Sequence, residues 1–222
     1  MPLTTINTAT AILASNLFKQ GRIVLFSPIV DFGTLVKTAF ADLGYFPTDA
    51  TIAPSNTVNR TDVTAANREG GADVVLASNV TSLTIGYDIP VLTPDAIVRK
   101  LYNGATPRVL ATTLAAVEGY VVDPSAKLTG RMIVVRKRPP AADGTRTHQV
   151  VFHPRVDLSP NGTGNSNGQD TLIFRADVRA FDWTPSALLG AATYGSYGAQ
   201  FEVPDTKLQA LLDELSTAAA PA

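Results

Sequence analysis

The most regular stretch of the chain is DTLIFRADVRAF, residues 170–181. Within it, Phe174, Ala176 and Val178 alternate with charged residues. Because successive side chains of a strand point to opposite faces of a sheet, this alternation predicts a β-strand with one buried face. We expect the strand to cover residues 170–183, with the side of Phe174 and Val178 in the core.

Further strands are predicted on the N-terminal side of this one. They are expected at residues 22–30, 72–77, 81–89, 132–138 and 145–158. The run 109–122 fits either a helix or a strand. A loop at residues 160–169 contains three glycines and three asparagines, residues that tolerate positive φ, so we interpret it as the tip of a hairpin.

Three helices are expected. Residues 32–43 carry apolar side chains at helical spacing and end before Gly44. A second helix begins at Thr93 as N-cap with Pro94 behind it, and ends at Gly104. A third, amphipathic helix starts at Pro204, with a leucine stripe over its 12 or so residues.

This order of elements predicts a mainly β (α+β) fold, an antiparallel sandwich or barrel with a flanking helix and a C-terminal helix. No composition shift marks a domain boundary, so residues 1–222 are taken as a single domain. An extended arm is expected at residues 1–20, a long loop or hairpin arm at 46–71, and a helix with a tail at 204–222.

The segment 46–71 is polar and has little core-forming content. A loop of about 25 residues without structure of its own is uncommon inside a compact domain and is usually functional. Either it is a hairpin arm that reaches a neighbouring molecule, or it is disordered. The residues that we expect at an interface are Ser55, Asn56, Thr57, Asn59, Arg60, Thr61 and Asp62.

The composition excludes several classes of function. The net charge is −1, without the positive excess typical of stable nucleic-acid binding. The chain has no cysteine, so cysteine-ligated metals and thiol nucleophiles are ruled out. Charged residues make up 17% of the chain, against about 25% in an average protein, which suggests a surface that partners cover.

Few residues point to chemistry. His148 and His153 stand five apart on one predicted strand, so they face opposite sides and cannot share a metal ion. The basic cluster Arg131, Arg136, Lys137 and Arg138 fits a charged strand end that protects a sheet edge; an intersubunit salt bridge or a phosphate contact stays open. We expect no cofactor, no signal peptide and no membrane anchor.

The order of segments resembles the major tail tube proteins of long-tailed bacteriophages. The step AFADLGYF at residues 39–46 precedes TDATIAP at 48–54 and the polar stretch through Arg60. Near the end, VVFHPRV at 150–156, a glycine-rich interruption and the strand at 170–181 resemble the closing strand pair of that family. Ala50 stands where the family usually has glycine, and the C-terminal helix has no match.

The resemblance implies a two-sheet β-fold whose copies form rings, commonly of six, stacked into a hollow tube. Its implied partners are other copies of the chain, a tape measure protein, tail-end proteins and DNA in passage without specific binding. The place implied is the phage tail, assembled in the host cytoplasm. The arm would contact the neighbouring ring.

Two other functions stay open at this point. One is another virion component, such as a tail terminator, a capsid decoration protein or a minor coat protein. The other is an enzyme or binder on a β-scaffold, which would need a pocket of converging polar residues. No such convergence is evident in the sequence, so we expect a protein that is not an enzyme.

Overall fold

The computed structural model describes residues 21–28, 40–47, 50–92, 96–103, 109–110, 119–120, 125, 127–141, 143–166, 168–186 and 188–216. The fold is mainly β. The strands are β1 (Gly21–Pro28), β2 (Ala41–Asp42), β3 (Ser55–Ala65), β4 (Val74–Val91), β5 (Val109–Leu110), β6 (Gly119–Tyr120), β7 (Leu128–Lys137), β8 (Thr147–Ser166), β9 (Gln169–Val178) and β10 (Ala199–Pro204). The helices are α2 (Ala96–Tyr102), the short η1 (Ala191–Thr193) and α3 (Asp205–Ser216).

Eight of these strands form one antiparallel sheet in the order β2-β1-β7-β8-β9-β4-β3, with β10 added beside β8. The 20-residue strand β8 is its centre. One edge of β8 pairs with β7, and the other pairs first with β10 and then with β9. β5 and β6 form a separate two-stranded sheet.

The sheet curls so that its two ends meet. Segment 43–45 lies between β1 and the C-terminal end of β4. The amide of Leu43 donates to the carbonyl of Val24 at 3.0 Å, and the amide of Leu92 donates to the carbonyl of Tyr45 at 2.9 Å. These two bonds satisfy backbone groups that a flat sheet would leave unpaired at its edges, and they give the body a sandwich-like form.

Both faces of the central strands are buried, in two hydrophobic clusters. On β7, Met132 and Val134 belong to the first cluster, which β4, β9 and α2 complete. The alternate residues Ile133 and Val135 belong to the second, which α3 and the segment before β10 cover. Because helices or curled strands cover each face, β7 reads as a continuous apolar run rather than an alternating one.

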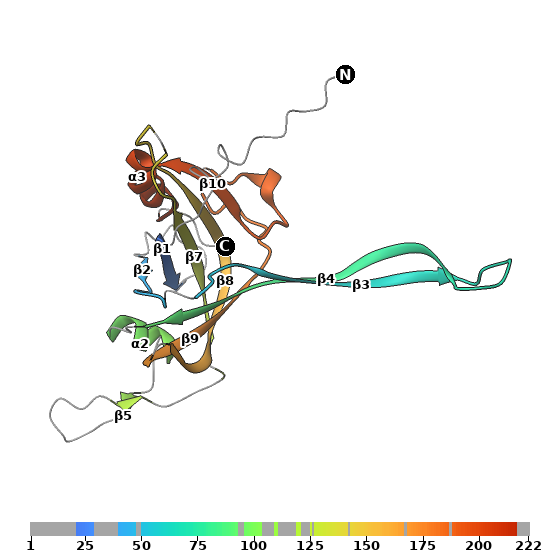
Figure 1. Cartoon of the computed structure of the whole chain (residues 1–222), viewed down its shortest axis with the longest axis horizontal. Helices are drawn as coiled ribbons and strands as arrows, with labels where there is room; N and C mark the ends of the chain where they lie inside the picture. Colours follow the sequence, from blue (N-terminus) through green and yellow to red (C-terminus); the bar gives the residue numbers. More distant parts are fainter. Residues whose placement is uncertain are drawn as a thin grey trace.

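The hairpin β3–β4 leaves this body as a long arm (Figure 1). β4 has two parts. Ile85 to Val91 pair with β9 inside the sheet, whereas the residues before them pair only with β3. We call the hairpin over residues 55–84 the arm. Its strands cross over one another before they reach the turn that joins them.

The structure confirms the main features predicted from sequence. β9 buries Phe174, Ala176 and Val178 on one side, as the alternation predicts. α3 turns Leu215 and its neighbouring leucines toward the second cluster. α2 lies within the second predicted helix and buries Val98 and Leu101. The first residues, 1–20, and the tail after Ser216 lie outside the described residues.

Four predictions need correction. The helix expected at 32–43 falls mostly outside the described residues, and its last turn is strand β2, which pairs with β1. The strands expected at 72–77 and 81–89 are one strand, since pairing with β3 carries β4 through the polar residues between them. The hairpin predicted at 160–169 is present, but its loop is shorter than expected, because β8 continues to Ser166 and β9 begins at Gln169.

The basic cluster does not guard an edge. β7 lies between β1 and β8, and three of the four residues have partners inside the body. Arg131 is buried and stands over the ring of Phe40 at 5.6 Å. Arg136 donates to Gln149 Oε1 and to the carbonyl of Ile52, each at 3.2 Å. Arg131 and Arg136 therefore pack against the interior of the fold, whereas Lys137 is exposed.

Candidate interaction surface

The arm is exposed along its whole length. Every residue of β3 from Ser55 to Thr64 is exposed, as is every residue of β4 from Val74 to Thr84. The seven residues predicted at an interface, Ser55, Asn56, Thr57, Asn59, Arg60, Thr61 and Asp62, all lie on β3 and so come together on one strand. The segment 46–71 thus supplies one strand of the arm and its turn, and the second strand follows it.

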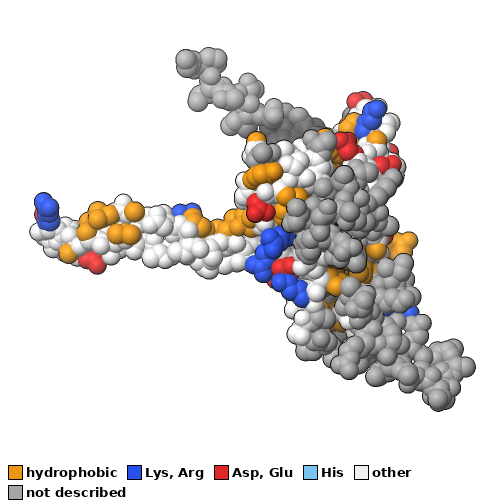
Figure 2. Space-filling view, turned by 180° about the vertical axis from the view of Figure 1, so that it is seen from behind, with side chains coloured by type: hydrophobic (Ala, Val, Ile, Leu, Met, Phe, Trp, Pro, Cys, Tyr) orange, Lys and Arg blue, Asp and Glu red, His pale blue; other side chains and the backbone are white. Residues whose placement is uncertain are grey.

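The arm also carries most of the exposed large apolar side chains. Among the described residues ten such side chains are exposed, and seven of them lie on the arm: Val58, Val63, Val74, Val75, Leu76, Val80 and Leu83. On the face of the arm seen in Figure 2, hydrophobic side chains lie near the tip and near the base, between mostly uncharged polar side chains. Single exposed apolar residues are ordinary, but such a concentration marks a contact surface.

Four of these residues share one face of the arm. Opposite residues of paired strands lie on the same face, and every second residue returns to it. Val58 pairs with Leu83, Arg60 with Val80 and Thr64 with Val75. We call this side the apolar face. The two register shifts of the hairpin preserve it, because each adds its extra residue to β4 and leaves β3 regular.

Few interactions hold the arm together beyond its backbone ladder. Asn59 Nδ2 donates to Ser82 Oγ at 2.8 Å, and Thr81 Oγ1 donates to the carbonyl of Asn59 at 3.1 Å. At the turn, the amide of Glu69 donates to Asn67 Oδ1 at 3.0 Å. A two-stranded ribbon with no covered face is marginally stable in water. Burial against another molecule would therefore stabilise this arm.

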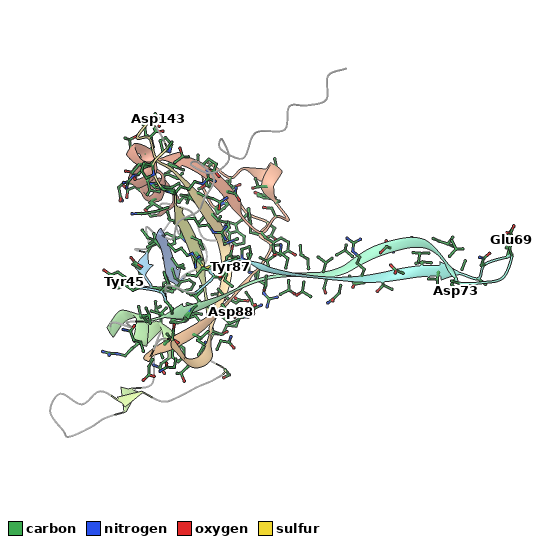
Figure 3. The ribbon with its side chains drawn as sticks, in the orientation of Figure 1. Tyr45, Glu69, Asp73, Tyr87, Asp88 and Asp143 are labelled. Carbon is green, nitrogen blue, oxygen red and sulfur yellow. The ribbon has the colours of Figure 1, made fainter. Side chains whose placement is uncertain are left out.

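The root of the arm is pinned to the body by a chain of hydrogen bonds. Figure 3 shows Tyr87 where the arm meets the body. Its Oη lies 2.8 Å from His153 Nε2, and His153 Nδ1 lies 2.7 Å from the carbonyl of Tyr197. A carbonyl can only accept, so Nδ1 carries the proton and Nε2 accepts from the Tyr87 hydroxyl. Tyr197 Oη in turn donates to the carbonyl of Leu83 on the arm at 3.4 Å.

Burial determines the protonation states in this chain. It raises the pKa of Tyr87 to about 12, although the nearby Arg136 acts in the opposite direction. It also lowers the pKa of His153, which its bond to the Tyr197 carbonyl offsets only in part. The root therefore holds a neutral imidazole and a neutral phenol, hydrogen-bonded to one another where the arm leaves the body.

A charged network lies beside the root. Arg175 of β9 forms ion pairs with Asp88 at 3.2 Å and with Asp177 at 2.9 Å. The guanidinium crosses over Gly86 of β4, where a Cβ atom would stand 2.2 Å from Arg175 Nη2. Charged side chains gather at this junction in Figure 2. Glycine at position 86 is thus what lets β4 pass under the arginine into the arm.

Two further titratable groups of the body, Asp157 and His148, form structural contacts. Burial opposes ionisation of Asp157, but hydrogen bonds from Lys127 and Arg179 outweigh it and lower the pKa of that carboxyl. His148 Nε2 lies 2.7 Å from Asp205 Oδ1 at the start of α3, while His153 faces the arm root. The two histidines are therefore apart, as their spacing predicts.

The described part of the chain contains no group of three or more His, Asp or Glu residues placed to hold a metal ion. None of the described helices is both long enough and apolar enough to span a membrane.

Sequence reasoning missed the apolar half of this surface. It selected polar residues of β3, and it predicted a strand at 72–77 without placing its valines and Leu76 at an interface. The turn signal was present, since Gly70 and Gly71, both at positive φ, follow Asn67 between two β-rich runs. A hairpin through that turn places Val75 opposite the exposed Thr64, which would have identified Val75 as exposed.

Comparison with known proteins adds no relative. No protein-family model matches the chain, and no curated protein matches it.

Proposed function

We propose that this chain is a structural subunit that assembles with copies of itself into stacked rings, forming the hollow tail tube of a long-tailed bacteriophage. The observation that carries the proposal is the arm, a ribbon with both faces exposed and seven exposed large apolar side chains. Such a ribbon loses stability when it stands alone in water and gains it when a neighbour covers it.

The size of the arm suits an interface of ordinary buried area. β3 has 11 residues, which at about 3.3 Å each span about 36 Å. With a width of about 10 Å, each face of the ribbon offers roughly 360 Å². Two covered faces would bury about 700 Å², close to the roughly 800 Å² that one partner buries in a standard interface.

The composition supports a polymer with a neutral channel. Only 17% of residues are charged, which suits a subunit whose surface is buried in permanent contacts. A net charge of −1 offers DNA few cationic contacts, so the genome would pass without being held by counterion release. The role is structural rather than catalytic.

The finer points of the proposal derive from the resemblance in segment order. They are rings of six, contacts of the arm with the next ring, a tape measure protein inside the tube, and proteins that close its ends. The location would be the virion tail, with assembly in the host cytoplasm.

Electron microscopy of the purified protein in negative stain, with light scattering alongside, tests the proposal. Tubes or stacked rings with a central hole are the expected result. Single rings that do not stack would replace the tube subunit with a terminator. A monomer at every concentration, also in the presence of tail-end complexes, would contradict self-assembly.

A further inference from the structure

The outer edge of β3 is a regular and unpaired strand edge. β3 stands last in the strand order, and among the described residues it pairs only with β4. It has 11 residues without proline, and both bulges of the hairpin place their extra residue on β4. Natural edges are usually shortened, bulged or interrupted by proline, and β3 has none of these features.

The charges on β3 are arranged to complement themselves. Its only charged residues are Arg60 and Asp62, which are two apart and so share a face. In an antiparallel pair of two such strands with Thr61 opposite Thr61, Arg60 of each copy stands opposite Asp62 of the other. Opposite charges directly across a pair stabilise it, and like charges destabilise it.

We propose that the β3 edge pairs with the β3 edge of a second copy, antiparallel and centred on Thr61. The two hairpins then form a four-stranded sheet around a two-fold axis. Away from the axis, Asn59 stands opposite Val63 of the second copy and Val58 opposite its Thr64. The surface is isologous, so one edge serves as both donor and acceptor and the assembly closes at two copies.

Other registers are disfavoured by the same two charges. A shift of two residues places Arg60 against Arg60 in one direction, and Asp62 against Asp62 in the other. A parallel arrangement in register would place Arg60 against Arg60 and Asp62 against Asp62 at the same time. β4 is a poorer edge, because Thr81 and Leu76 interrupt it as the extra residues of the two bulges.

This pairing does not rest on the tube proposal. Neighbouring subunits of a polar stack of rings all point the same way, so no two-fold axis relates them. The paired arms are a state of the free subunit, in which two exposed edges protect one another from nonspecific strand addition. Assembly into rings would replace this state.

A charge exchange tests the pairing. R60D and D62R each create two like-charge pairs across the axis, and we expect each to weaken the dimer about tenfold, roughly threefold for each pair. The double variant R60D/D62R restores both opposite pairs and should return the dissociation constant to the wild-type value. Sedimentation velocity over a concentration series at low salt measures all four proteins.

Crosslinking tests the register independently, and the natural chain has no cysteine to interfere. T61C places two thiols directly opposite one another at a Cα separation of about 5 Å, within the range of a disulfide. N56C is the matched control on the same strand. Its thiols would be ten residues apart along the paired strands, about 33 Å. Mild oxidation should crosslink T61C and leave N56C monomeric on a nonreducing gel.

The outcomes separate clearly. Weakening by both single exchanges, recovery in the double and selective crosslinking of T61C support the pairing. Equal crosslinking of T61C and N56C, additive weakening in the double variant, or a wild-type monomer with uncrosslinked T61C would overturn it. Thermal melting of each variant checks the body, which these exposed arm residues do not touch.

Discussion

The histidine at the root of the arm makes the stability of the fold depend on pH. His153 is 5% exposed, donates through Nδ1 to the Tyr197 carbonyl and accepts at Nε2 from the Tyr87 hydroxyl. The bond accepted at Nε2 requires the neutral imidazole, whereas the bond donated by Nδ1 does not. Burial lowers its pKa below the value of 6.5 that the unfolded chain shows. As the pH falls below about 6.5, the imidazole of the unfolded state binds a proton that the folded state does not bind. The free energy of unfolding that is present above this pH is therefore lost.

The size of the effect follows from one proton. The free energy of unfolding should fall by up to about 1.4 kcal/mol for each pH unit below 6.5, until the folded imidazole itself is protonated. The chain has a second histidine, His148, so the contribution of His153 has to be isolated with a variant. Replacement H153Q keeps a polar side chain near Tyr87 and removes the titration. It should cost about 1–3 kcal/mol at pH 7.5, because buried partners lose their bonds.

Urea unfolding of both proteins at pH 7.5, 6.5, 5.5 and 5.0 measures the effect, with fluorescence of Trp183, the single tryptophan, as the signal. Wild type should lose stability more steeply than H153Q, and the two curves should converge toward acid. Parallel curves for the two proteins would refute the assignment of a buried neutral imidazole to the arm root.

Two further substitutions test the core and the arm root. F174D introduces a carboxylate at a fully buried position, where the Phe174 ring meets Tyr102 edge to face. It should lower the free energy of unfolding by at least about 3–5 kcal/mol and abolish the cooperative melt in circular dichroism, whereas the exposed control Q200D should melt normally. A wild-type melting temperature for F174D would show that this face is not core. G86A places a Cβ atom against the Arg175 guanidinium and disturbs its ion pairs. We expect urea unfolding to show a destabilisation of about 0.5–1 kcal/mol that is largely absent when Arg175 is also replaced by alanine. An equal loss of stability with and without Arg175 would contradict the crossing of Arg175 over Gly86.

Local patterns predicted the body of the fold well where burial follows the simple period of a strand or helix. The alternation around Phe174 and the leucine stripe ending at Leu215 identified β9 and α3, because each element buries one face.

The arm was only half predictable. Its polar strand was selected as a contact surface, but Val74, Val75 and Leu76 were not, since exposed apolar residues and buried ones give the same composition signal. The length of β4 depends on pairing with β3, a contact that no local pattern shows. The hydrogen bond between His153 and Tyr87 at the root of the arm joins residues 66 apart in sequence. Only the order of strands in the sheet brings these two residues together.

The most direct test of the account compares assembly of the wild-type chain with that of an arm-shortened variant. In the arm-shortened variant, an Asn-Gly turn replaces residues 58–83 and joins Thr57 to Thr84, which are paired in the hairpin. The pairing of β4 with β9 is left intact. A second variant with the same turn in place of residues 66–73 removes only the tip. Electron microscopy and sedimentation of the three proteins at equal concentration give the answer. We expect tubes or stacked rings for wild type and folded, unassembled subunits for the arm-shortened variant. Tubes of normal length from that variant would show that the arm is not needed for assembly.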